Sequence, residues 1–114
     1  MLIEEGTKLH VIYRALYEKS TRRHFLGEII KCDGVVCLLQ GYEFVYDPKL
    51  ETYQRKPERR RTIIDLAESG YVVNIIDPNV KLDDVSYKYS RETGMVATDG
   101  KSFSLGINEF GLRN

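Results

Sequence analysis

The side chains most able to do chemistry form a basic run over positions 54–61, in a chain of 114 residues whose 17 basic and 17 acidic residues cancel. Phosphate recognition requires such local positive charge, because counterion release drives much of the binding. A net charge of zero gives no global attraction to nucleic acid or to a membrane. Any electrostatic partner therefore depends on this run, whose cations are Arg55, Lys56, Arg59, Arg60 and Arg61.

Aromatic residues lie next to this run. An Asp-Pro pair after Tyr46 predicts a type I turn. With a loop of four residues, Tyr46 pairs with Tyr53 and Phe44 pairs with Arg55. Rings interleaved with arginines are a stacking platform of the kind that single-stranded nucleic acid uses. The sequence therefore predicts a candidate nucleic-acid-binding hairpin made of the five cations, Tyr53 and Phe44.

The same residues have a second interpretation. Aromatic side chains that alternate along a strand usually face a core, and charge runs near loops are usually solvated surface. The hairpin also carries carboxylates that can neutralise the cations, namely Glu43, Glu51, Glu58 and Asp65. The sequence leaves both interpretations open.

The two cysteines, Cys32 and Cys37, do not indicate a metal site. Structural zinc needs four tetrahedral ligands, and this pair lacks both Cys-x-x-Cys spacing and a second pair. Cys37 lies in an apolar run, which favours core filling. Two cysteines are also too few for a secreted disulfide scaffold, so we expect free thiols in a reducing cytoplasm.

Catalytic motifs are also missing from the sequence. It contains no Gly-x-Ser-x-Gly elbow and no glycine-rich phosphate loop, and Asp83-Asp84 lacks the spacing of a calcium loop. We predict no catalytic residues and no cofactor. A weaker hypothesis is a small enzyme with a pocket lined by tyrosine and by His10 or His24. The latter is expected to be a partly exposed strand residue.

The elements that position these residues are predicted to be short β-strands. Thr7–Tyr17 fits both an alternating strand and an amphipathic helix, and its β-branched and aromatic content favours the strand. Tyr71–Ile76 is apolar on both faces apart from Asn74, which predicts a central, covered strand. Cys32-Asp33-Gly34 predicts a tight hairpin, and Gly41 is expected to separate two strands. The other predicted strands are 23–31, 35–40, 42–47, 52–56, 60–65, 85–90, 95–98 and 101–105.

Turn chemistry in the last third of the chain predicts a three-stranded meander. A turn at residues 91–94 and an Asp-Gly pair at Asp99 connect its strands. If these turns set the register, Tyr89 lies opposite Val96, which lies opposite Phe103. An apolar row then crosses the three strands.

These observations predict one mainly β domain over residues 1–114, a small antiparallel barrel or sandwich of about eight short strands with room for one short helix. An α+β fold is the alternative. The acidic N-terminus and the short apolar runs indicate neither a signal peptide nor a membrane span. Eight tyrosines and strands with apolar residues on both faces favour self-association. We therefore predict a cytoplasmic, homo-oligomeric, non-enzymatic binding domain, with nucleic-acid binding as the alternative function.

Overall fold

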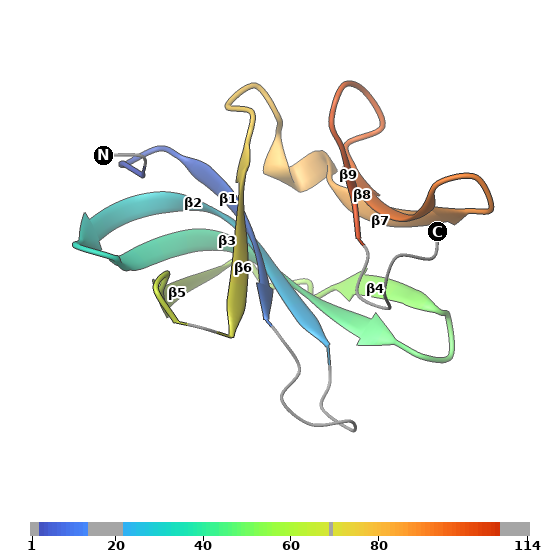
Figure 1. The fold of residues 1–114 in the computed structure, drawn as a ribbon, viewed down its shortest axis with the longest axis horizontal. Coiled ribbons are helices and arrows are strands. Elements are labelled where there is room, and N and C mark those ends of the chain that lie inside the picture. Colours follow the sequence, from blue (N-terminus) through green and yellow to red (C-terminus); the bar gives the residue numbers. More distant parts are fainter. Residues whose placement is uncertain (1–2, 14–21, 69, 108–114) are drawn as a thin grey trace.

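Two antiparallel sheets make up the part of the chain that the computed structural model describes, residues 3–13, 22–68 and 70–107 (Figure 1). This confirms the mainly β prediction, although the sheets do not close into a barrel. A short 3-10 turn, η1 (Leu82–Asp84), is the helical segment among these residues. The strands are β1 (Lys8–Tyr13), β2 (Arg23–Asp33), β3 (Val36–Asp47), β4 (Thr52–Arg55), β5 (Arg60–Asp65), β6 (Tyr71–Ile76), β7 (Ser86–Ser90), β8 (Gly94–Thr98) and β9 (Ser104–Gly106).

The larger sheet has the order β4-β3-β2-β1-β6, and β5 also pairs with β3, whose two halves therefore have different partners. The smaller sheet is the meander β7-β8-β9. In Figure 1 it lies beside β4, at one end of the larger sheet. None of the described residues belongs to a helix that is long and apolar enough to cross a membrane.

Several strand predictions are confirmed. Residues 8–13 of the ambiguous first segment form a strand, whereas residues 14–17 lie outside the described part. The hairpin of β3 and β4 has the predicted register, with Tyr46 opposite Tyr53 and Phe44 opposite Arg55. The turn chemistry at Asp47 therefore fixed the loop length correctly.

The expected break at Gly41 is wrong, because β3 runs through this residue without interruption. Gly41 lies directly opposite Gly27 of β2. A Cβ atom at Gly41 would clash with the Leu26 carbonyl oxygen and lie 2.6 Å from Gly27 Cα. Gly41 thus permits a close approach of two backbones, and glycine inside a strand can mark such an approach as well as a break.

β6 is also not the central, covered strand that its composition predicted. It pairs with β1 alone among the described strands and forms an edge of the larger sheet. Val72 and Ile75 are exposed. A continuous apolar run therefore did not distinguish a covered strand from an edge strand with unused apolar surface.

The meander exists, but its predicted register is wrong. Tyr89 lies opposite Met95, and Val96 lies opposite Lys88 and Gly106. The second turn is longer than the expected Asp-Gly hairpin, because the Asp99 carboxylate accepts hydrogen bonds from the backbone N–H groups of residues 101 and 103. These bonds hold the pKa of the Asp99 carboxyl below its usual value.

Two apolar clusters cover opposite faces of the larger sheet. The first core lies on the face of odd-numbered β1–β3 residues. It consists of Leu9, Val11, Phe25, Ile29, Cys37, Leu39 and Ile64. The second core fills the space between the two sheets. Its buried residues are Leu26, Phe44, Tyr53, Ile76, Val80, Leu82, Val85, Tyr87, Ala97 and Ile107.

The expectation of free thiols is wrong, because Cys32 and Cys37 form a disulfide. The two residues are register partners across the hairpin of β2 and β3. Gly34 has φ +64° and opens the two-residue turn between Asp33 and Val36. Counting outward from this turn places the cysteines opposite each other, so the sequence contained a signal for the pairing.

Candidate functional site

The basic run does not form one continuous patch, because part of it surrounds a buried carboxylate. Glu43 is 7% exposed and lies on the face of the first core. Its Oε1 atom lies 3.3 Å from Arg23, 3.3 Å from Arg60 and 3.9 Å from the Lys56 ammonium. Lys56 and Arg60 therefore serve mainly to compensate a charge that would otherwise be costly to bury.

A second part of the run packs around Tyr42 on the opposite face of the sheet. The Arg55 guanidinium lies 4.5 Å from the centroid of the Tyr42 ring, and that of Arg59 lies 5.8 Å from it. Arg55 also donates to the Asp83 carbonyl oxygen at 3.0 Å, and Arg59 lies 3.8 Å from the Asp83 carboxylate. Tyr42 donates its hydroxyl proton to the same carboxylate at 2.8 Å.

The remaining predicted site residues are placed differently again. Arg61 is exposed on β5, where its side chain lies on the uncovered side of the strand. Phe44 and Tyr53 are buried in the second core. Within residues 3–13, 22–68 and 70–107, the structure separates the seven candidate residues into two ion-pair groups, one cation without an ion-pair partner and two core rings, with no shared stacking surface.

Two histidines and a tyrosine form a buried polar cluster that sequence reasoning missed. His10 of β1 and His24 of β2 are both 0% exposed, which contradicts the partly exposed strand residue expected for His24. His10 Nε2 and His24 Nδ1 both contact the Tyr87 hydroxyl of β7, at 2.7 Å and 2.5 Å. The His24 ring also stacks on Tyr53, with centroids 4.4 Å apart. The cluster thus connects the two sheets.

The hydrogen bonds of this cluster indicate where its protons lie. The Tyr87 hydroxyl has one proton, so it donates to one imidazole and accepts from the other. His10 Nδ1 is buried without a hydrogen-bond partner. Because orphaned buried donors are rarer than orphaned acceptors, the favoured arrangement protonates His10 on Nε2. His10 then donates to Tyr87, which donates to His24.

Burial also sets the charge state of the cluster. Desolvation, with a smaller contribution from His24, lowers the pKa of His10 to about 3. Desolvation raises the pKa of the Tyr87 hydroxyl. His10 and Tyr87 are therefore neutral at physiological pH, and neither is poised to exchange a proton near pH 7. A structural hydrogen-bond network that joins the two sheets is the role that this geometry supports.

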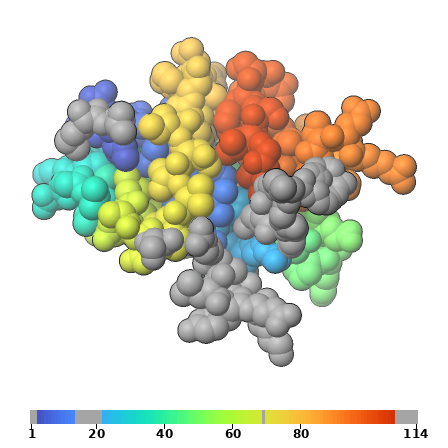
Figure 2. Space-filling view, viewed as in Figure 1, coloured from blue at the N-terminus to red at the C-terminus, as the bar shows by residue number. Residues whose placement is uncertain are grey.

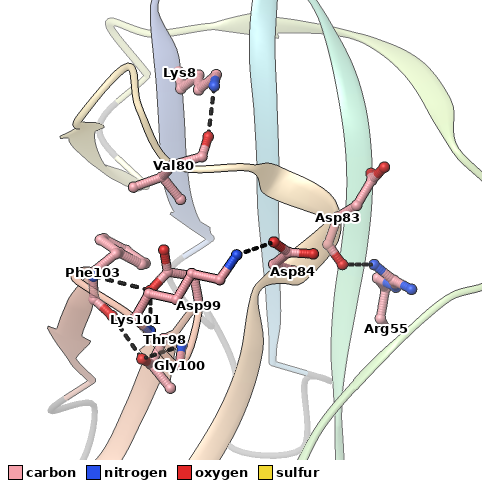
Figure 3. A network of polar contacts seen from close by, with 10 residues as sticks. All are labelled: Lys8, Arg55, Val80, Asp83, Asp84, Thr98, Asp99, Gly100, Lys101 and Phe103. Carbon is pink, nitrogen blue, oxygen red and sulfur yellow. Dashed lines mark hydrogen bonds and ion pairs between the residues drawn. The ribbon is translucent and has the colours of Figure 1, made fainter.

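An open cavity of ≈ 380 Å³ lies between β4 and the segment that leads into β7. Phe44, Tyr53 and Tyr87 line its aromatic part. Its charged lining residues already have partners. Arg55 binds the Asp83 carbonyl, and Lys101 lies 3.3 Å from the Asp84 carboxylate (Figure 3). A ligand would have to displace these contacts. No group of three or more metal-ligating side chains occurs among the described residues.

Exposed apolar side chains gather at the opposite end of the larger sheet. β5 is hydrogen-bonded to β3 on one side, and none of the other described strands pairs with its second edge. Ile63, at the middle of β5, is 71% exposed. Its register partner is the half-buried Leu38, and Val36 on the same face is also exposed. We call the surface made by Val36, Leu38 and Ile63 the β5 patch.

No known protein family, curated protein or solved structure matches this chain.

Proposed function

We propose that this protein is a non-enzymatic interaction domain that acts through self-association. The observation that carries the proposal is the exposure of Ile63, which is 71% exposed at the middle of an edge strand. Natural edge strands are usually protected by charges, by proline or by cover from another segment. An exposed isoleucine at the centre of an open edge strand would promote aggregation of a monomer, whereas in a protein that pairs with a second copy it would be buried at the contact.

The second support is the condition of the groups that would otherwise suit catalysis. His10 and His24 are fully buried, and the Tyr87 hydroxyl is engaged by both imidazoles. A general acid or base must reach the proton that it transfers, within hydrogen-bond distance of a bound substrate. These side chains meet each other instead, which favours a structural role for them.

Sedimentation velocity over a range of protein concentrations tests the proposal. We expect the wild-type protein to sediment as more than a monomer at micromolar concentration. Ile63→Lys should shift it to the monomer, because an ammonium group would replace the exposed apolar side chain at the centre of β5. Ile75→Lys is the matched control, since Ile75 is an exposed isoleucine on β6, another edge strand of the same sheet. A wild-type protein that remains monomeric throughout would refute self-association.

Single-stranded nucleic-acid binding is a second candidate function. It is favoured by the exposed guanidinium groups of Arg55 and Arg59 over the Tyr42 ring. It is weakened by the ion pairs that already occupy Lys56, Arg59 and Arg60. Fluorescence anisotropy with a labelled oligonucleotide at low and moderate salt distinguishes the outcomes. Affinity that falls steeply with salt and is lost in Arg55→Ala/Arg59→Ala supports binding, and a flat signal at low salt rejects it.

A further inference from the structure

The outward face of β5 carries a charge pattern that is complementary to itself. Arg61, Ile63 and Asp65 alternate on this face and are all exposed. The order along the strand is therefore cation, apolar residue, anion. Among the described residues, neither Arg61 nor Asp65 has an ion-pair partner within 4.0 Å. Asp65 accepts a hydrogen bond from the Ala67 backbone at 3.0 Å, which leaves its charge uncompensated.

An antiparallel copy of the same strand matches this pattern. When β5 is rotated about a two-fold axis through Ile63, the two isoleucines meet, and each Arg61 lies opposite the Asp65 of the other copy. Directly opposed residues of opposite charge stabilise antiparallel pairs. Two-fold symmetry is also the commonest arrangement of protein dimers, and it places identical surfaces in contact.

The alternation of side chains restricts the register of such a pair. A shift by one residue would place Ile63 opposite Thr62, a residue of the opposite face, and would misalign the two sheets. Shifts by two residues keep the faces aligned but separate Arg61 from Asp65. The register centred on Ile63 is therefore the one that satisfies both the faces and the charges.

The surroundings of β5 favour the same arrangement. On the face drawn in Figure 2, the yellow-green atoms of β5 lie at the molecular surface, beside the turquoise end of the β2–β3 hairpin. In the paired sheet, Leu38 and Ile63 of each copy would form one apolar row across four strands. Val36, which is opposite Asp65 in the β3–β5 register, would lie beside the ion pair.

We propose that two copies of this chain associate through antiparallel pairing of β5 centred on Ile63, with reciprocal Arg61–Asp65 ion pairs. This inference rests on the proposed self-association and names its interface. It joins the two larger sheets into one continuous sheet and satisfies the open hydrogen-bonding edge of β5.

Charge reversal tests the pairing. Arg61→Glu or Asp65→Lys alone creates two like-charge contacts and should weaken dimerisation about tenfold or more in sedimentation equilibrium. The double variant restores opposite charges and should regain most of the affinity. Asp65→Asn retains an acceptor for the Ala67 N–H and removes the charge, so it should show a smaller loss. Far-ultraviolet circular dichroism of each variant verifies folding.

A cross-link gives a second measurement that is independent of charge. Ile63→Cys should form a covalent dimer under mild oxidation, because the two side chains meet at the two-fold axis, whereas Ile75→Cys should not. A wild-type dimer whose single reversals have no effect, or whose double reversal fails to recover, would overturn this interface and leave self-association intact. A monomeric wild-type protein would overturn both.

Discussion

The two faces of the larger sheet are packed by different chemistry. The first core is filled by aliphatic side chains, Phe25 and Cys37. The face toward the second sheet carries His10 and His24, whose rings bind the Tyr87 hydroxyl of β7. The first face depends on volume and shape over most of its area, and it also holds the buried Glu43 carboxylate with its surrounding cations. The second face holds His10, which burial keeps neutral, so protonation of His10 in acid should act on this face.

The largest expected effect is the loss of stability in acid, which acts through His10 on the second face. Below pH 6.5 the unfolded chain protonates His10, whereas the folded protein does not until about pH 3, its lowered pKa. The unfolded state then binds more protons, so stability falls as pH drops through this window, by up to about 5 kcal/mol. Urea unfolding across this range should show the loss.

His10→Gln is the matched variant for this measurement, because its amide can still donate to Tyr87 and does not titrate. It should be less stable than the wild type at neutral pH and should lose less stability in acid. An unchanged acid dependence in this variant would show that the pH sensitivity arises elsewhere.

A core truncation probes the first face. Leu39 is 0% exposed, so Leu39→Ala should lower the free energy of unfolding by about 3 kcal/mol, through lost burial and the cavity that remains. Leu38→Ala is the control on the same strand, since its half-buried side chain points to the other face. We expect it to cost under about 1 kcal/mol. If both variants lose the same unfolding free energy, the side chains that β3 places in the first core do not contribute more to stability than those on its other face.

Removal of one hydroxyl probes the second face with the smallest change. Tyr87→Phe retains the ring and leaves both imidazoles without this partner, so it should cost about 1–3 kcal/mol. Tyr89→Phe, at a ring that is 67% exposed, should change stability by less than about 0.5 kcal/mol. Thermal unfolding at pH 7 measures both. A neutral Tyr87→Phe would mean that the histidines find other partners.

Local turn chemistry accounts for the parts of the fold that the sequence predicted. The Asp-Pro turn after β3 determines the β3–β4 loop, and the predicted register of Tyr46 and Phe44 is correct. The meander shows the limit of this reasoning. Its first two strands are where they were predicted, but the third begins at Ser104 and not at Lys101, because the Asp99 side chain closes a longer loop than an Asp-Gly pair implies. This side-chain acceptor therefore shifted the register between β8 and β9, whereas the register between β7 and β8 is set by the turn at residues 91–93.

The candidate sites depended on contacts between distant parts of the chain. Glu43 and Arg60 are 17 positions apart, and the buried position of Glu43 follows from the packing of the first core. The His10–Tyr87 contact joins residues 77 positions apart, and no local pattern encodes such a pair. Exposure of the β5 edge was equally hidden, because the composition of Arg60–Asp65 predicts a strand without revealing its neighbours.

The contact of Gly41 with Gly27 has a consequence for how this sequence can vary. Aliphatic residues in the cores can be exchanged for others of similar volume with modest loss. At position 41 even one added carbon would meet backbone atoms of β2, which no rotamer change can move aside. In a saturation library, we expect this position to accept only the parent residue. The distance between the two main chains, and not the hydrophobicity of the side chain, would then determine which residues position 41 accepts.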